Sequence, residues 1–124
     1  MKKKVLVVED EEMQAKFIAN VLVKAGYEVF LCEEGIYAKS ILDLDKFDLV
    51  FLDINIPNIN GLKLLEIIRS SENQINFKTP VIICTATFDL NDQIQSMENR
   101  ANEYLVKPIL PEQIKTVVAN YTNA

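Results

Sequence analysis

The 124-residue sequence contains no histidine and only two cysteines, Cys32 and Cys84. The two cysteines lie in separate apolar runs and form no Cys-x-x-Cys pair, so the side chains that build a zinc site are missing. We expect both to be buried free thiols. The chain therefore lacks ligands for soft metals, and a metal that it binds has to be held by oxygen atoms.

Long apolar runs are also absent. No segment approaches the roughly 20 apolar residues that a membrane span requires. The run Val5–Val8 follows three lysines, but it ends at Glu9 and is too short for the apolar core of a secretory signal. We therefore expect a cytoplasmic protein that has no membrane partner.

Positive charge is sparse and dispersed. The 13 Lys and Arg residues are outnumbered by 18 Asp and Glu residues, which gives a net charge of −5. A nucleic-acid-binding face needs clustered basic side chains, so direct binding to nucleic acid is not expected. The length and the 49% hydrophobic content fit one domain with a single core over residues 1–124.

Short apolar runs alternate along the chain with segments of helical periodicity. The apolar runs are Val5–Val8, Tyr27–Cys32, Leu49–Leu52, Val81–Cys84 and Tyr104–Val106. Nearly continuous apolar runs are typical of parallel strands that are buried on both faces. The helical segments contain Met13, Phe17, Val21 and Leu22; Ile36–Leu44; Leu62, Leu65 and Ile68; Leu90, Ile94, Met97 and Ala101; and Leu110, Ile114, Val117, Val118 and Tyr121.

This alternation predicts a doubly wound α/β fold of the (βα)₅ type, with helices on both faces of a parallel sheet. Gly26 stands where the first helix would end, and Pro111 fits the first turn of the last helix. The polar stretch Ser70–Thr79 is expected to be a surface loop between the third helix and the fourth strand.

Polar and charged residues follow four of the predicted strands. They are Glu9 and Asp10 after the first strand, Asp53 after the third, Thr85 after the fourth and Lys107 after the fifth. In a doubly wound sheet, ligands bind at this carboxyl edge. Carboxylates that lie close together disfavour joint ionisation, and a bound cation together with an ammonium group would relieve the conflict. An all-oxygen site of this kind suits Mg²⁺ as the cofactor.

Each of these residues also has an ordinary structural interpretation. The acidic run that starts at Glu9 could cap a helix and complement its dipole. Asp53 could be a turn residue, Thr85 a hydroxyl at a strand end, and Lys107 a surface lysine. Their joint placement at four strand ends of one sheet is what indicates a site.

These motifs resemble those of the CheY-like receiver domains of two-component signalling, from about Lys3 to the last helix. The matching segments are Val5-Leu-Val-Val-Glu9-Asp10-Glu11, Leu52-Asp53-Ile-Asn55-Ile-Pro57-Asn-Ile-Asn-Gly61-Leu, Pro80-Val-Ile-Ile-Cys-Thr85-Ala86 and Tyr104-Leu-Val-Lys107-Pro108. The segments are weak signals singly and specific together. The resemblance implies a flavodoxin-like fold whose five parallel strands lie in the order 2-1-3-4-5.

The resemblance also implies the roles of the site residues. Asp53 matches the phosphoacceptor, which also binds Mg²⁺. Asp10 matches a direct metal ligand, Glu9 a ligand that acts through water, and Asn55 the residue whose backbone carbonyl completes the protein's ligands.

Further roles follow from the same resemblance. Thr85 and Lys107 match the hydroxyl and the ammonium that hold phosphoryl oxygens, and Tyr104 matches an aromatic rotamer switch. Ala86 is small and leaves the site open to a donor. A cis peptide bond between Lys107 and Pro108 is expected, since the family uses one there to direct the ammonium inward.

The resemblance implies a switch and not a conventional enzyme. The switch would support its own phosphoryl transfer and a slow autodephosphorylation. Because the chain contains no histidine, the phosphoryl donor has to be another protein or a small acyl-phosphate-like molecule. The resemblance implies a histidine kinase or a histidine phosphotransfer protein as the partner. We expect the face of the fourth helix, fifth strand and fifth helix to signal to a downstream protein target. The chain would be a monomer or a weak, phosphorylation-dependent dimer.

One residue departs from the family pattern. Arg100 precedes Ala101 where many relatives have glycine. If that position requires a positive φ, arginine is strained there or the loop differs.

Three other classes of protein share features with this sequence. A haloacid-dehalogenase-type phosphatase needs Asp-x-Asp after the first strand, where this chain has Glu9-Asp10-Glu11. A flavodoxin needs a loop there that cradles phosphate, and acidic residues would repel it. An unphosphorylated pseudo-receiver that acts as a protein-interaction module is the alternative that stays open.

Overall fold

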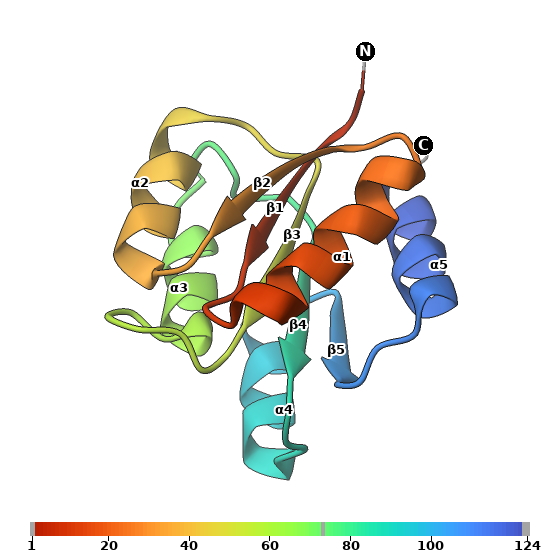
Figure 1. Ribbon diagram of the computed structural model, residues 1–124. Helices are drawn as coiled ribbons and strands as arrows, with labels where there is room; N and C mark the ends of the chain where they lie inside the picture. Colours follow the sequence, from red (N-terminus) through yellow and green to blue (C-terminus); the bar gives the residue numbers. More distant parts are fainter. Residues whose placement is uncertain (1, 73, 123–124) are drawn as a thin grey trace.

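The computed structural model describes residues 2–72 and 74–122, and within them five strands alternate with five helices (Figure 1). The strands are β1 (Lys4–Val8), β2 (Glu28–Cys32), β3 (Leu49–Asp53), β4 (Val81–Thr85) and β5 (Glu103–Val106). The helices are α1 (Glu12–Lys24), α2 (Gly35–Leu44), α3 (Gly61–Ile68), α4 (Leu90–Glu98) and α5 (Pro111–Thr122). Position 73 of the predicted loop, and positions 1, 123 and 124 of the predicted domain, lie outside the described residues.

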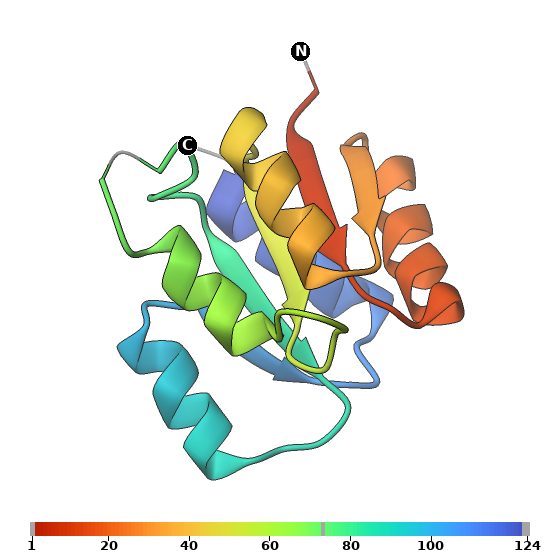
Figure 2. The same cartoon turned by 90° about the vertical axis from the view of Figure 1, so that its left-hand side faces the viewer.

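All neighbouring strands pair in parallel, in the order β2-β1-β3-β4-β5. The helices α2, α3 and α4 cover one face of the sheet, and α1 and α5 cover the other (Figure 2). The predicted doubly wound (βα)₅ fold and its strand order are therefore confirmed. The winding reverses between β1 and β3, which is where such folds bind their ligands.

The central strands form the middle of the core. β3 and β4 are buried along their whole length, because helices cover both of their faces. Val50 and Leu52 belong to the apolar cluster under α2 and α3, whereas Leu49 and Phe51 belong to the cluster under α1 and α5. Burial on both faces accounts for the continuous apolar runs in the sequence.

The loop between α3 and β4 differs from the prediction of a surface loop, because Asn76 and Thr79 are buried. Asn76 Nδ2 donates to the backbone carbonyls of Leu42, at 2.7 Å, and Asp45, at 2.8 Å. Asn76 Oδ1 accepts from the Phe47 N–H at 2.9 Å. A buried amide whose hydrogen bonds are satisfied ties this loop to the connection between α2 and β3.

Arg100, which follows α4, has a φ of +65°. The position at which many relatives have glycine therefore does adopt a positive φ in this chain. A left-handed arginine is strained, and surrounding contacts have to hold it. One of its guanidinium nitrogens donates to the Arg69 carbonyl at 2.7 Å, and its carbonyl accepts from Arg69 Nε at 3.3 Å. Its guanidinium also lies over the ring of Phe77, 5.2 Å from the centroid.

Candidate functional site

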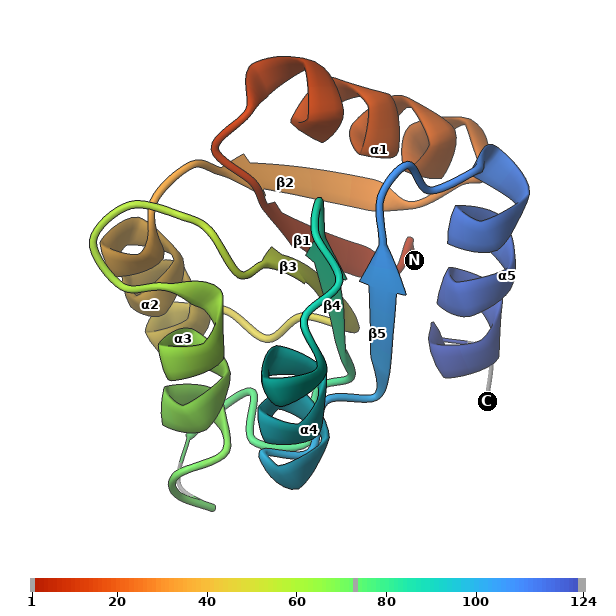
Figure 3. The ribbon, with the colours of Figure 1, turned by 90° about the horizontal axis from the view of Figure 1, so that it is seen from below.

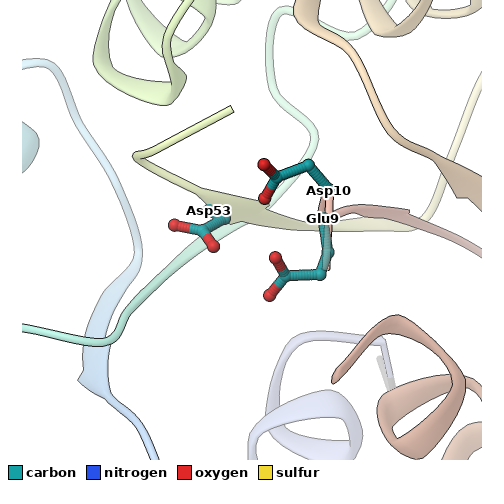
Figure 4. Close-up of side chains that lie close together, drawn as sticks. All are labelled: Glu9, Asp10 and Asp53. Carbon is teal, nitrogen blue, oxygen red and sulfur yellow. The ribbon is translucent and has the colours of Figure 1, made fainter. Parts of the chain in front are cut away.

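Three carboxylates meet at the carboxyl edge of the sheet, where β1 and β3 end side by side (Figure 3). The pairing of Val8 with Leu52 brings Glu9 and Asp10 to the level of Asp53. One carboxylate oxygen from each of the three acids lies within 4.8 Å of the other two (Figure 4). Glu9 and Asp53 are buried, and Asp10 is exposed.

Lys107 joins two of these acids. Its ammonium donates to Asp53 Oδ2 at 3.0 Å and also to Glu9 Oε1, and its side chain is only 8% exposed. The backbone N–H of Lys107 donates to the carbonyl of Thr85 at 2.7 Å, which continues the pairing of β4 with β5. The peptide bond between Lys107 and Pro108 is cis, as predicted. Lys107 is therefore part of the acidic site, and its interpretation as a surface lysine is wrong.

The site holds more negative than positive charge. Burial raises the pKa of Glu9 from 4.5 to about 7; the hydrogen bond from Lys107 opposes this shift, and the neighbouring Asp53 adds to it. Burial alone would lower the pKa of Lys107, but its hydrogen bonds to Glu9 and Asp53 leave that pKa raised. Lys107 is therefore a cation at neutral pH, and it does not neutralise the three acids by itself.

The donor set fits a hard divalent cation. Glu9, Asp10 and Asp53 offer carboxylate oxygens, and the described residues bring no imidazole or thiolate to this group. Mg²⁺ prefers oxygen ligands of this kind, commonly one or two carboxylates together with water and phosphate oxygens. The exposed position of Asp10 leaves the group accessible from solvent.

The loop after β3 orients the carboxylate of Asp53. The backbone N–H of Asn55 donates to Asp53 Oδ1 at 3.0 Å, while the Asn55 side chain is exposed. Gly61 begins α3 directly against this strand end, and a Cβ atom added there would collide with the Asp53 carbonyl oxygen. Gly61 is thus a site residue to which the sequence analysis gave no role, although it lies in the motif that contains Asp53.

The acidic run after β1 serves two purposes. Glu9 and Asp10 belong to the site, whereas Glu11 is the N-cap of α1 and accepts from the Met13 N–H at 3.3 Å. Glu12 lies in the first turn of α1. The capping interpretation therefore holds for Glu11 and Glu12, whereas Glu9 and Asp10 lie with Asp53, where the site interpretation places them.

Thr85 and Ala86 lie at the end of β4, beside the acids but without a hydrogen bond to them among the described residues. The buried Thr85 hydroxyl donates instead to the Thr87 carbonyl at 3.3 Å. Ala86 is exposed. The predicted role of Thr85 toward a phosphoryl oxygen therefore stays a prediction, as does that of the Asn55 carbonyl toward a metal.

Tyr104 lies on β5 with its ring packed against the core cluster under α2 and α3. Its hydroxyl is buried and has no hydrogen-bond partner in the described part of the chain. The ring of Phe88, from the loop after β4, stands against it. Phe88 was not predicted as a site residue, because its one signal in the sequence is that a large aromatic residue lies outside the predicted strands and helices.

Comparison with known proteins identifies the family. The family model of the response regulator receiver domain matches residues 5–119, and the chain belongs to this family. The response regulator ArlR of Staphylococcus saprophyticus is 35% identical over 111 residues, which are 90% of this chain and 48% of that protein. The chain likewise spans 44% of the transcriptional regulatory protein CusR of Escherichia coli, at 31% identity over 85% of this chain.

A solved structure supports the same assignment. The receiver domain of the sensor histidine kinase PA1611 from Pseudomonas aeruginosa has a TM-score of 0.89 and is 25% identical, with all of both chains covered. That structure has a magnesium ion coordinated in its active-site cleft. The chain is thus a receiver domain of two-component signalling, which is a signalling domain rather than a conventional enzyme. None of the described helices is long and apolar enough to cross a membrane.

Proposed function

We propose that the chain accepts a phosphoryl group onto Asp53 from the phosphohistidine of a histidine kinase or a histidine phosphotransfer protein, in a reaction that depends on Mg²⁺. The observation that carries this proposal is the setting of the Asp53 carboxylate. It is buried at a strand end, with Oδ2 bound by Lys107 and Oδ1 bound by the Asn55 N–H. Residues 1–124 would act as one receiver domain, of which residues 5–119 match the family.

Asp53 is the nucleophile in this proposal. One of its carboxylate oxygens attacks phosphorus, the bond from phosphorus to the donor's imidazole nitrogen breaks, and the electron pair stays with the imidazole. The product is an acyl phosphate. The hydrogen bonds from Lys107 and Asn55 hold the carboxylate in one orientation before the donor arrives.

The surrounding residues would stabilise the charge that develops on the phosphoryl oxygens. Phosphoryl transfer passes through a loose transition state, so catalysis is mainly positioning and electrostatic stabilisation. The Lys107 ammonium faces one oxygen, and the Thr85 hydroxyl leaves the Thr87 carbonyl to donate to another. Ala86, the exposed residue after Thr85, gives a donor room to approach.

Four groups would hold the metal: the carboxylates of Asp10 and Asp53 and the backbone carbonyl of Asn55 directly, and the carboxylate of Glu9 through water. Mg²⁺ bound there supplies the positive charge that neutralises phosphoryl oxygens and relieves the repulsion among the acids. The magnesium ion in the receiver domain of PA1611 supports this assignment.

The output proposed is a change in the face formed by α4, β5 and α5. When Thr85 turns toward the phosphoryl group, space opens near β5 and the position of Tyr104 changes. A downstream protein reads this face, and the domain acts in the cytoplasm as a monomer or a weak, phosphorylation-dependent dimer. Slow hydrolysis of the acyl phosphate, which the same site supports, ends the signal.

The proposal is tested by the intact mass of the protein after incubation with acetyl phosphate and Mg²⁺. We expect the wild type and Asp45→Asn, which changes an exposed acid at the end of α2, to gain the mass of one phosphate. Asp53→Asn, and the wild type in excess EDTA, should gain none. If the wild type is not labelled by acetyl phosphate or by any phosphohistidine donor, the pseudo-receiver interpretation is correct instead.

A further inference from the structure

Helix α4 turns its apolar side chains toward solvent. Leu90, Ile94 and Met97 are 61%, 46% and 49% exposed. They are spaced by four and three residues, so they lie along one side of the helix. We name these three residues the α4 stripe. Ser96 is the one buried residue of α4.

This arrangement is the reverse of that in the neighbouring helix. α3 buries Leu62, Leu64, Leu65 and Ile68 against the sheet. The inner side of α4 instead carries Ser96, whose hydroxyl donates to the Asp92 carbonyl at 2.7 Å. A helix on a domain surface normally turns its apolar side to the core. α4 also lies at one end of the row formed by α2, α3 and α4 (Figure 2). The exposed side chains of the α4 stripe are therefore accessible to another molecule.

The charged residues of α4 and its N-terminal flank have one sign, and the nearest cation along the chain, Arg100, is turned to the Arg69 carbonyl and the ring of Phe77. Residues 88–99 include Asp89, Asp92 and Glu98 and contain no lysine or arginine. Asp89 caps the helix by accepting from the Asp92 N–H at 3.0 Å. None of the three acids forms an ion pair within the described residues. The stripe is therefore an apolar surface with an acidic border.

This charge pattern decides between occupants. A second copy placed on the same stripe by a twofold axis would bring acids against acids, which is unfavourable. Nucleic acid and anionic lipid would be repelled for the same reason. A protein segment with apolar side chains on one side and lysine or arginine beside them would cover the stripe and pair with the acids.

We propose that the α4 stripe binds a basic amphipathic helix of a partner protein. The inference rests on the proposed output function, and it specifies the chemistry of the downstream target. The apolar contacts supply most of the affinity, and the acids select partners by charge.

The probe for the test is a synthetic amphipathic peptide of about 18 residues, five helical turns, with leucine on one side and lysine on the other. A matched peptide carries glutamate in place of lysine. Each is titrated into unphosphorylated, ¹⁵N-labelled protein. We expect chemical-shift changes concentrated in residues 88–99 with the lysine peptide and none with the glutamate peptide. Shifts centred on the acidic loops near Asp10 and Glu33 instead would overturn the inference.

Variants separate the stripe from general attraction to an acidic protein. The double variant Ile94→Ser with Met97→Ser should bind the lysine peptide at least about tenfold more weakly. Leu44→Ser, which changes an α2 residue that is 78% exposed, should bind it as the wild type does. The double variant Asp92→Lys with Glu98→Lys should bind the lysine peptide more weakly than the wild type does and should bind the glutamate peptide. Unchanged binding in both double variants, each folded by circular dichroism, refutes the inference.

The same proteins are incubated with acetyl phosphate and Mg²⁺ and weighed by mass spectrometry. Normal labelling of variants that lose peptide binding supports a role confined to output. A wild type that is labelled but does not bind the peptide at α4 overturns this inference alone. A wild type that binds at α4 but is never labelled overturns the proposed phosphorylation alone. Self-association of the wild type that Ile94→Ser abolishes would make a second copy the occupant and would contradict the inference.

Discussion

The ring of Phe88 stands edge-on to the ring of Tyr104, with the centroids 6.3 Å apart and an angle of 85° between the planes. The Tyr104 hydroxyl is buried without a hydrogen-bond partner in the described residues, and burial raises its pKa. Leaving a buried hydroxyl unpaired costs about 1–3 kcal/mol, whereas an aromatic pair contributes about 0.5–1.5 kcal/mol. The ring contact with Phe88 therefore offsets part of the cost of the unpaired hydroxyl and helps to hold Tyr104 in this position.

Phe88→Ala should therefore release Tyr104 toward solvent. We expect the ¹⁹F signal of 3-fluorotyrosine at position 104, assigned with Tyr104→Phe, to show a larger solvent isotope shift in Phe88→Ala than in wild type. Leu44→Ala, which changes a distant exposed residue of α2, serves as the control. An unchanged signal for Tyr104 would mean that Phe88 does not hold it.

A phosphoryl mimic should change the partner of Thr85. In the structure, the Thr85 hydroxyl donates to the Thr87 carbonyl. With beryllofluoride and Mg²⁺ bound, we expect a crystal structure to show this hydroxyl donating to the mimic, with altered positions of Tyr104 and α4. Identical rotamers of Thr85 and Tyr104 with and without the mimic would rule out this switch, even if Asp53 is phosphorylated.

The metal-free protein should lose stability as the pH rises toward neutrality. The pKa of Glu9 is raised from 4.5 to about 7 in the folded protein, chiefly by burial. Between these values the folded state binds more protons than the unfolded state, so the free energy of unfolding falls as pH rises. At about 1.4 kcal/mol per pKa unit, the loss is at most about 3.5 kcal/mol.

This pH dependence can be measured by chemical denaturation between pH 5 and pH 8. Glu9→Gln should flatten the profile in that interval, because the amide does not titrate. Mg²⁺ should bind more tightly as Glu9 ionises, with protons released into the buffer during calorimetry. The same slope in Glu9→Gln as in wild type would assign the effect to another group.

Lys107→Gln should lower the stability of the metal-free protein and slow its phosphorylation. Removing the ammonium leaves the buried carboxylates of Glu9 and Asp53 without their shared cation, and breaking a buried pair of this kind costs about 3–5 kcal/mol. We expect a lower melting temperature without metal, a larger rise on adding Mg²⁺, and labelling by acetyl phosphate at least about tenfold slower. Lys63→Gln, at an exposed lysine of α3, should behave as the wild type in all three measurements.

The strands, their parallel arrangement and the meeting of Glu9, Asp10, Asp53 and Lys107 at one edge of the sheet could be predicted from the sequence, because continuous apolar runs mark the strands and the residues after them lie at the carboxyl edge. The roles of these residues toward a metal and a phosphoryl group stay predictions. Which side of α4 faces the sheet could not be predicted from the sequence. The period of Leu90, Ile94 and Met97 shows that they share one side of a helix, but not that this side faces solvent. The polar composition of the loop before β4 also gave a wrong prediction for Asn76. This residue is buried, because backbone groups form hydrogen bonds with its side-chain amide.

The central claim is that Asp53 carries the phosphoryl group, and reductive trapping tests it most directly. Borohydride converts an aspartyl phosphate into homoserine, which tandem mass spectrometry locates in a peptide digest. After incubation with acetyl phosphate and Mg²⁺, we predict homoserine at position 53 and nowhere else, and none when Mg²⁺ is withheld. Homoserine at Asp10, or an Asp53 that stays unmodified while the intact protein gains a phosphate, would contradict the assignment.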